Sequence, residues 1–314
     1  MVGPDAVKPV RVVAPVVADA LAQGQPVVAL ETTVITHGLP EGQNLRTALE
    51  LEAAVRDRGA VPATIGVLGG ALRIGLSAEE LRELAATHRA TKVNLSNLGA
   101  VVASGRPGSA TVAATVFAAA QAGIRVMATG GIGGVHRGVE QSGDISSDLT
   151  ALARHPVAVV CAGAKAVLDL PRTMEMLETL GVPVYAFRTP ELPAFYRRTS
   201  GVAVDQSFDR MDELARAVRA HWAIGGVSGV VVGNPIPTEF EMPSDLYEDA
   251  LQRALSEATT QRVRGRELTP FLLERMRVLT EGRSVFSNIA LLKSNAQVAA
   301  SLAVLLAANP GDPG

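Results

Sequence analysis

Two side chains suited to acid–base or nucleophilic chemistry stand where apolar runs end. The first, Glu31, directly follows PVVAL (26–30) and precedes the polar loop TTVITHGLP. A carboxyl group that is partly removed from water has a raised pKa and can serve as a proton donor. The alternative is a surface glutamate, or one that caps a loop amide. The nearby His37 is interpreted as structural.

The second is Lys165, which lies within the apolar segment VAVVCAGAKAVLDLP. Desolvation lowers the pKa of a lysine, and a neutral amine forms Schiff bases with carbonyl compounds. Lys165 is therefore a candidate nucleophile. The alternative is a lysine that marks the end of a strand and extends to the surface. Cys161, in the same segment, is expected to belong to the core rather than to act as a nucleophile.

A glycine-rich segment, TGGIGGVHRG (129–138), follows the apolar run RVMA. Glycines allow backbone amides to approach an anion closely, and this loop also carries His136 and Arg137. It is not a dinucleotide-binding fingerprint, because the third required glycine position is occupied by His136. Two interpretations remain open, a loop that lines a site and a flexible connector.

Two acids and two hydroxyls follow within five residues, in QSGDISSDLTALARH. Asp144, Ser146, Ser147 and Asp148 can offer oxygen ligands to a hard divalent cation that keeps several waters. Alternatively, Ser146 or Ser147 is the N-cap of the helix that follows, and Asp148 in the first turn complements the helix dipole.

Other polar residues allow both functional and structural interpretations. Lys92 is either a contact for a phosphate or carboxylate or an exposed strand lysine, and Asn97 is expected at the end of that strand. Asn288 is expected to be the N-cap of a long helix whose surface Lys293 covers. The proline-stiffened segment GNPIPTEFEM (233–242) suits a loop that closes over a pocket.

These candidates must be positioned by a regular succession of strands and helices. Continuous rather than alternating apolarity indicates strands covered on both faces, hence a mostly parallel sheet whose ligands bind beyond the carboxyl ends of its strands. Gly69-Gly70 predicts a tight hairpin over 67–75 that adds an antiparallel edge. The expected strands lie at 26–30, 63–68, 91–95, 125–129, 157–161, 183–187 and 229–233; the expected helices lie at 44–59, 77–88, 111–123, 148–155, 171–181 and 209–222, and three more follow.

Composition restricts the class of protein and its partners. The 314 residues carry 29 Lys+Arg against 31 Asp+Glu, and 47% are hydrophobic, which describes a compact chain with a sizeable core. With a net charge of −2 and 4% aromatic residues, general nucleic-acid binding is not expected. One cysteine cannot form an intrachain disulfide, which favours a reducing compartment.

The sequence favours one domain in the cytoplasm. No linker or repeat interrupts the pattern, and no uninterrupted apolar run reaches the roughly 18 residues that a membrane span needs. The Ala/Leu-rich stretch 296–308 is broken by Gln297 and Ser301 and is expected to be a core element. Asp19 and Pro15 argue against a signal peptide.

Taken together, the segments resemble the pseudouridine-5'-phosphate glycosidase family, in order from about residue 10 to about residue 308. The segments that carry the resemblance are ALETTVITHGLP, PATIGVLGG, KVNLSNL, TVAATVFAAAQAGIRVMATGGIGGVHRG, DISSDL, VVCAGAKAVLDLPRTMEMLETLGVPVYAFRT, GVVVGNPIP and SNIALLKSNAQVAASLAVLLA. The resemblance implies a single-domain, three-layer α/β/α fold with a large, mostly parallel mixed sheet, a homotrimer, and reversible cleavage of pseudouridine 5'-phosphate into uracil and ribose 5-phosphate by a lyase. Residues 1–9 and 309–314 are unmatched and are expected to be disordered.

The resemblance also implies roles for individual residues. Glu31 is the expected proton donor, Lys165 the nucleophile that holds C1' of the opened ribose as an imine, and Asp144 the ligand of one Mn²⁺ ion per subunit. The expected substrate contacts are Lys92, Val112, Thr129, His136, Ser146, Ser147, Asp148 and Asn288.

Two other functions fit the same residues. A Schiff-base aldolase acting on a sugar phosphate also needs a lysine in an apolar run. A non-catalytic sugar- or nucleotide-binding protein would use the same glycine-rich loop. Release of uracil separates the glycosidase from both.

Overall fold

The fold is built around one eleven-stranded sheet with helices on both faces. The computed structural model describes residues 10–87, 90–263 and 265–308. The predicted disordered ends 1–9 and 309–314 lie outside these residues. The strands are β1 (Arg11–Val13), β2 (Val27–Leu30), β3 (Val61–Leu68), β4 (Ala71–Ile74), β5 (Thr91–Val93), β6 (Gly108–Ala110), β7 (Val126–Ala128), β8 (Ala158–Cys161), β9 (Val184–Phe187), β10 (Gln206–Phe208) and β11 (Val230–Gly233).

The helices follow the strands in sequence, as the apolar pattern predicts, and three close the chain. They are α1 (Pro15–Ala22), η1 (Val34–Gly38), α2 (Asn44–Arg56), α3 (Ala78–Ala85), α4 (Leu98–Ser104), α5 (Val112–Ala122), α6 (Val139–Ser142), α7 (Ser147–Arg154), α8 (Leu170–Thr179), α9 (Met211–Ala223), η2 (Thr238–Phe240), α10 (Ser244–Thr260), η3 (Gly265–Glu267), α11 (Leu268–Leu279) and α12 (Arg283–Ala307).

The sheet is mostly parallel. The main path runs β1-β4-β3-β2-β7-β8-β11-β9-β10, and only the pairings of β3 with β4 and with β6 are antiparallel among the described strands. β3 is long enough to pair with β6 as well as with β2, because residues 61–64 pair with β2 while residues 66–67 pair with β6. This branch brings β5 and β6 beside the carboxyl end of β2.

The predicted hairpin is present, but its place in the sheet differs from the expectation. Gly69 and Gly70 adopt φ values of 58° and 76°, which residues with a Cβ rarely tolerate, and join β3 to an antiparallel β4. β4 is not the edge, because β1 pairs with it in parallel and forms the edge itself. The periodicity gave no sign of β1, since it has only three residues and they are not buried.

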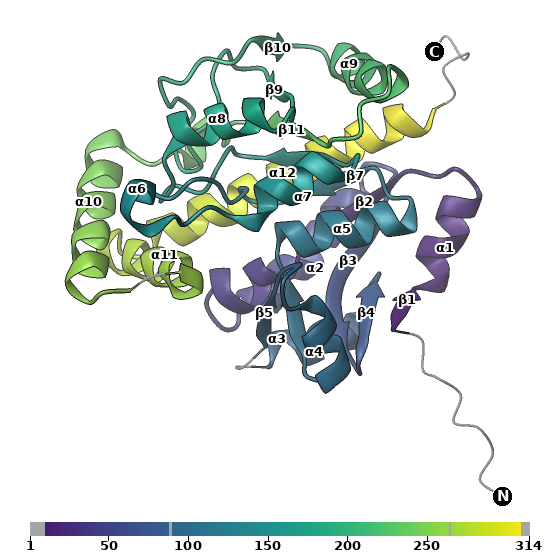
Figure 1. The fold of residues 1–314 in the computed structure, drawn as a ribbon. Helices are drawn as coiled ribbons and strands as arrows, with labels where there is room; N and C mark the ends of the chain where they lie inside the picture. Colours follow the sequence, from purple (N-terminus) through teal and green to yellow (C-terminus); the bar gives the residue numbers. More distant parts are fainter. Residues whose placement is uncertain (1–9, 88–89, 264, 309–314) are drawn as a thin grey trace, which may run out of the picture.

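The two faces of the sheet carry different helices (Figure 1). Helices α5 and α7 pack together on one face, while α2 and α12 pack together on the other, where α12 contacts β2, β7 and β8. The central strands are buried on both sides, which explains their continuous apolar sequences. Cys161 is a buried core residue at the end of β8, as expected, and burial raises the pKa of its thiol to about 11.

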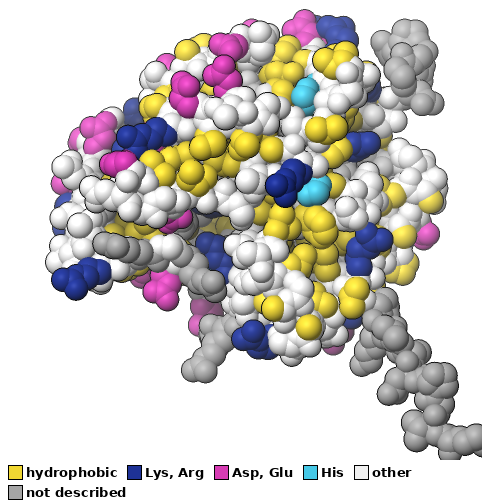
Figure 2. Space-filling view, in the orientation of Figure 1, with side chains coloured by type: hydrophobic (Ala, Val, Ile, Leu, Met, Phe, Trp, Pro, Cys, Tyr) yellow, Lys and Arg dark blue, Asp and Glu magenta, His cyan; other side chains and the backbone are white. Residues whose placement is uncertain are grey.

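Hydrophobic side chains reach the surface over the middle of the face that α5 and α7 form, while most acidic side chains lie toward the margins of this view (Figure 2). Contiguous apolar surface of this kind is typical of interfaces between proteins.

Helix α12 begins earlier than the sequence indicates. The expectation that Asn288 is its N-cap is wrong, because the helix begins at Arg283, directly after Gly282 with a φ of 83°. The Thr280 hydroxyl accepts a hydrogen bond from the N–H of Ser284 at 3.1 Å and satisfies a donor of the first turn. Asn288 therefore lies inside the helix and is buried. Lys293 forms an ion pair with Glu50 of α2, with 2.6 Å between Nζ and Oε2.

Among the described helices, α12 is the one whose length and composition would allow it to span a membrane. It has 25 residues and a mean hydropathy of 1.6. α12 is not an uninterrupted apolar run, because Asn288, Lys293 and Gln297 lie within it. The expectation that its 296–308 stretch belongs to the core agrees with its burial. Asn295 lies in the middle of α12, fully buried and hydrogen-bonded to the loops that follow β7 and β11. Contacts with the sheet and with α2 and α9 make α12 the central helix of the core.

Candidate active site

A cavity of about 430 Å³ opens beyond the carboxyl ends of β2, β7 and β8, where a parallel sheet is expected to bind its ligand. This size falls within the roughly 300–1,000 Å³ range of small-molecule sites. Most of the residues expected to act on the substrate line it, namely Glu31, Lys92, Val112, His136, Asp144, Ser146, Ser147, Asp148, Lys165 and Asn288. Segments that are separated by more than 250 positions in the sequence therefore meet in one pocket.

Glu31 is buried where β2 ends and the π-helical turn η1 begins. Removal from water raises the pKa of its carboxyl group, and the charge of Asp148 acts in the same direction. The positive charges of Lys165 and Lys92 and a hydrogen bond from the Thr129 hydroxyl oppose this rise. A carboxyl group with a raised pKa retains its proton near neutral pH more readily than a surface glutamate does.

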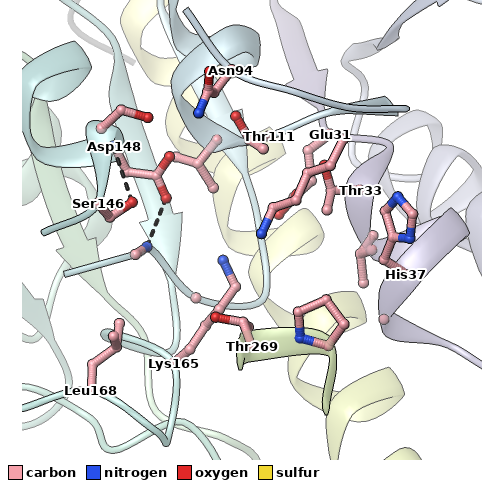
Figure 3. A pocket seen from close by; sticks show the side chains of 18 of the residues that line it. Glu31, Thr33, His37, Asn94, Thr111, Ser146, Asp148, Lys165, Leu168 and Thr269 are labelled. Carbon is pink, nitrogen blue, oxygen red and sulfur yellow. Dashed lines mark hydrogen bonds between the residues drawn. The ribbon is translucent and has the colours of Figure 1, made fainter. Parts of the chain in front are cut away.

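Lys165 extends into the pocket from the loop after β8 (Figure 3). Its backbone N–H donates to the carbonyl of Ile132 at 3.0 Å, so the loops after β7 and β8 continue to pair beyond the strands. Figure 3 shows His37 and Thr33 on one side of this lysine and Ser146 and Asp148 on the other. Lys165 is half-buried within this ring of polar groups.

The glycine-rich loop is a fixed wall of the pocket rather than a flexible connector. A Cβ on Gly133 would lie 2.2 Å from the Ser146 hydroxyl oxygen, and a Cβ on Gly134 would lie 2.4 Å from the Thr173 hydroxyl oxygen. These two glycines are therefore required by close packing. His136 lies in the same loop, and burial lowers the pKa of its imidazole against the opposing charge of Asp144.

The loop offers fewer amides to an anion than the glycines suggest. The N–H of Ile132 donates to Gly163, that of Gly133 to Asp148, that of Val135 to the Thr173 hydroxyl and that of His136 to the carbonyl of Asp144. Because protein groups already accept from these four donors, they are not available to an anion.

Asp148 has a structural role, which the sequence could not distinguish from the role of a metal ligand. One carboxylate oxygen accepts the N–H of Ala113 at the start of α5, and the other accepts the N–H of Gly133, both at 2.8 Å. Both oxygens are thus engaged. Ser146 is the N-cap of α7, as one of the two alternatives had it, and its hydroxyl accepts the N–H of Asp148 at 3.2 Å.

The carboxylates of this segment do not form a closed metal site. Within the described residues no group of three His, Cys, Asp or Glu side chains is arranged to hold an ion. With Asp148 engaged, Asp144 is the carboxylate on this segment that remains suited to a cation. A hard cation bound through one carboxylate, with waters and a substrate phosphate completing its shell, is consistent with this donor set.

Thr129 is buried behind Glu31 and is not among the residues that line the pocket. Its hydroxyl donates to a Glu31 carboxylate oxygen, so it contacts the expected acid rather than the cavity. The proline-stiffened segment 233–242 does not line the pocket either. Its Asn234 lies against α12, where the side-chain amide donates to Asn295 at 2.9 Å.

Several lining residues were not expected from the sequence. Phe195 has a φ of 62° and packs against Gly131, where a Cβ would lie 2.7 Å from its ring. No local pattern marks this residue. Asn94 and Thr111 follow β5 and β6, and the rule that ligands bind at strand ends could have found them. Helix α11 adds Thr269, Pro270 and Leu273.

Comparison with known proteins gives a consistent result. A family model described as indigoidine synthase A like protein matches residues 16–305. A Paracoccus denitrificans protein named pseudouridine-5'-phosphate glycosidase is 52% identical over 301 residues, which cover 95% of this chain and 99% of that protein. An Escherichia coli protein of the same name is 51% identical, over 93% of this chain and 94% of its own.

The fold has a solved counterpart in the prealnumycin C-glycosynthase AlnA, whose crystal structure is a complex with ribulose 5-phosphate. The two chains are 38% identical and superpose with a TM-score of 0.87, over 97% of this chain and 98% of that one.

Proposed function

The chain belongs to the family of indigoidine synthase A like proteins, and we propose that it cleaves pseudouridine 5'-phosphate reversibly into uracil and ribose 5-phosphate. The relatives named pseudouridine-5'-phosphate glycosidase support this lyase-type activity over almost the whole chain. The observation that carries the proposal is the convergence of a buried acid, Glu31, and a pocket amine, Lys165, beyond the carboxyl ends of β2 and β8, which lie on either side of β7 in the sheet.

The bond to be broken explains this pairing. A C-glycosidic bond joins C1' of ribose to C5 of uracil, so the atom that leaves C1' is a carbon. The paired carboxylates of ordinary glycosidases protonate a leaving heteroatom, and this bond offers none. A covalent catalyst that stores the sugar as an iminium ion offers another route. The pocket provides one amine and one acid for that route.

In the proposed first step, the Lys165 amine bonds to C1' and the C1'–O4' bond breaks. O4' takes a proton and becomes the 4'-hydroxyl of the opened ribose. Glu31 then delivers its proton to C5 of uracil, the C1'–C5 bond breaks, and the lone pair of the lysine nitrogen forms a C1'=N iminium ion. Water adds to C1' and releases ribose 5-phosphate, and the proton freed when the amine is restored returns to the Glu31 carboxylate. Attack of uracil on the iminium ion reverses the sequence.

The phosphate is expected to bind the side of the pocket where Lys92, Asn94 and the start of α5 meet. Lys92 supplies positive charge there, and its charge acts on Glu31, His37 and His136 alike. His136 is expected to contact the substrate, and burial lowers the pKa of its imidazole. The family resemblance adds Val112, Ser146, Ser147 and Asn288 to the substrate contacts.

Asp144 is the residue that would hold one Mn²⁺ ion per subunit. A bound manganese ion supplies positive charge that polarises a water molecule and orients a phosphate-bearing substrate. Assembly into a homotrimer in the cytoplasm also belongs to this proposal, and the apolar surface over α5 and α7 supports an oligomer (Figure 2).

The relative AlnA is a C-glycosynthase, and its structure holds a pentulose phosphate. Formation of a C-glycosidic bond is the reverse of the cleavage proposed here. This relative supports a site for a five-carbon sugar phosphate and carbon–carbon chemistry in both directions.

One assay tests the function. The purified protein is incubated with pseudouridine 5'-phosphate and Mn²⁺, and uracil and ribose 5-phosphate are followed by chromatography and mass spectrometry. We expect both products in equal amounts, and none with Lys165→Ala. Recovery of intact substrate would favour a binding protein, and aldol products from sugar phosphates without uracil would favour an aldolase.

A further inference from the structure

A pair of buried amides connects the loop after β11 with the loop after β7 through helix α12. The side-chain amide of Asn234, just after β11, donates to Oδ1 of Asn295 at 2.9 Å. Asn295, in the middle of α12, is fully buried and donates its own amide to the carbonyl oxygen of Thr129 at 2.8 Å. The backbone N–H of Asn234 donates to the carbonyl of Cys161, the last residue of β8, at 2.8 Å.

Thr129 carries this network to the acid. Its backbone N–H donates to the carbonyl of Val160 at 3.0 Å, and its hydroxyl donates to a carboxylate oxygen of Glu31. The residue is buried and has no place in the pocket lining. Every polar group of Thr129 is therefore engaged by protein, and one of its partners is the expected proton donor.

We propose that Asn234 and Asn295 are positioning residues of the reaction, which hold the Thr129 backbone so that its hydroxyl stays on the Glu31 carboxyl group. This inference rests on the proposed function. It moves Thr129 from the substrate contacts, where the family resemblance placed it, to the support of the acid.

The physical reason is the direction of the Thr129 hydrogen bond. A hydroxyl that donates to a carboxylate favours the ionised form, and thereby opposes the desolvation that raises the Glu31 pKa. The charged groups that act on Glu31 are Lys165, Lys92 and Asp148. Because these remain when the hydroxyl is lost, removal of the hydroxyl raises the Glu31 pKa further.

The network also explains why Asn295, a polar residue, is buried in a core helix, and why Asn234 is buried beside it. A buried amide is stabilising only when its donors and acceptors are paired. Asn295 pairs both ends of its side chain with loops that follow two different strands, β7 and β11. The two asparagines thereby connect the loop after β7, which contains Thr129, to Cys161 at the end of β8. The loop that follows β8 carries Lys165.

The test compares four variants by kinetics and by NMR of the free protein. Thr129→Val removes the hydroxyl at nearly constant shape, and Thr129→Ser retains it. Asn295→Leu removes the link, while Asn234 keeps the Ser294 hydroxyl as a second acceptor, 3.0 Å away. Ser301→Ala is the control on the same helix, because the Ser301 hydroxyl donates to the carbonyl of Gln297 within α12 itself. In protein labelled with 13C-glutamate, the carboxyl signal of Glu31 is identified as the one that is missing from the spectrum of Glu31→Gln.

We expect Thr129→Val and Asn295→Leu to lower kcat about 10-fold or more with KM changed less than about 3-fold, the pattern of a lost transition-state contribution. Both should raise the Glu31 pKa measured by NMR and move the high-pH limb of the cleavage profile upward. Thr129→Ser should restore most of the kcat and of the Glu31 pKa that Thr129→Val changes, and Ser301→Ala should behave like the original protein.

An unchanged Glu31 pKa in folded Thr129→Val and Asn295→Leu would overturn the proposal, as would unchanged kcat in both. The NMR titration needs no turnover. Failure of the proposed function, with no uracil released by the unmodified chain, is therefore distinguishable from failure of this inference.

Discussion

The carboxylate of Asp148 accepts the backbone N–H of Gly133 at 2.8 Å and thereby ties the first turn of α7 to the glycine-rich loop that follows β7. Its other oxygen ties the same turn to the start of α5. One side chain thus holds together three segments that line the pocket. Its carboxylate accepts hydrogen bonds from backbone amides in the way that a bound anion would.

Replacement of Asp148 should therefore affect the fold more than the binding of metal. In Asp148→Asn one carboxylate oxygen becomes an amide nitrogen that faces a backbone donor. We expect a loss of about 1–3 kcal/mol in the free energy of unfolding, measured by urea titration, because a buried donor loses its acceptor. Asp144→Asn, the control in the same segment, should change this free energy by less than about 0.5 kcal/mol. A loss of Mn²⁺ affinity without a loss of stability in Asp148→Asn would instead make it a ligand.

The manganese proposal predicts weak binding that depends on Asp144. A single carboxylate with water ligands holds a cation less firmly than a closed cage of protein ligands. We expect EDTA to remove the activity reversibly, and Asp144→Asn to require at least about 10-fold more Mn²⁺ for half-maximal activity, in the range known for loss of a supporting group at a metal site. Titration of free Mn²⁺ by electron paramagnetic resonance measures the affinity directly. Equal Mn²⁺ affinity in the original protein and in Asp144→Asn would place the metal elsewhere.

Covalent trapping tests the nucleophile. Borohydride reduces an iminium ion to a stable amine, so treatment with ribose 5-phosphate and borohydride should add the mass of the reduced sugar phosphate at Lys165. Peptide mapping by mass spectrometry locates the label. Lys92→Met should still be labelled at Lys165, although at higher sugar concentration, whereas Lys165→Ala should not be labelled. A label at another lysine would show that the nucleophile has been assigned wrongly.

The raised pKa of Glu31 makes both activity and stability depend on pH. Cleavage needs the protonated acid, so we expect kcat to fall as the pH rises through the Glu31 pKa of the folded protein. Because that pKa lies above the reference value of 4.5, protonated Glu31 contributes stability that is fully present below 4.5 and is lost as the pH rises through the folded value. Glu31→Gln, which carries no charge, should gain in relative stability over the same window. Urea unfolding at successive pH values measures this difference.

If the stability difference between Glu31→Gln and the original protein stays constant with pH, Glu31 does not have a raised pKa. Uracil release by Glu31→Gln at the original rate would exclude it as the essential acid, whatever its pKa.

Close packing of the glycine-rich loop predicts unequal tolerance of alanine. Gly133→Ala would place a Cβ 2.2 Å from Ser146 Oγ and 2.7 Å from Asp148 Oδ2, so the loop or the start of α7 must shift. We expect the activity to fall by at least about 100-fold, because a shift of about 1 Å in the reacting groups costs a rate factor of this size. Gly99→Ala is the control, since its Cβ would meet no atom within 4 Å and α4 would gain about 0.5–1 kcal/mol. Thermal unfolding and uracil release measure the two effects, and full activity of Gly133→Ala would show that the loop adapts freely.

The sequence predicts the fold well where the residues of a single strand or turn are enough to identify it. Buried central strands such as β8 are continuously apolar because both faces are covered, and the Gly69-Gly70 turn follows from two positive φ values. Glu31 and Lys165 could be selected because each is a polar residue directly beyond an apolar run. The roles assigned to them remain predictions that the experiments above test.

Features that depend on distant partners could not be predicted in the same way. Whether Asp148 binds a cation or two backbone amides depends on where α5 and the β7 loop lie, and neither is encoded near residue 148. The same holds for Asn234 and Asn295, which are 61 positions apart. Neither residue indicates by itself that their side chains form a hydrogen bond. The start of α12 was misplaced because Gly282, rather than Asn288, provides the break in the chain.

The position of α12 after every strand of the sheet also determines when the pocket is completed. During synthesis the strands that precede Glu31 and Lys165 emerge before the helix that packs across β2, β7 and β8 and carries Asn288 and Asn295. A nascent chain that lacks residues beyond 282 exposes the sheet face that α12 covers. Premature termination in this last segment is therefore expected to yield an aggregation-prone chain rather than a partly active enzyme.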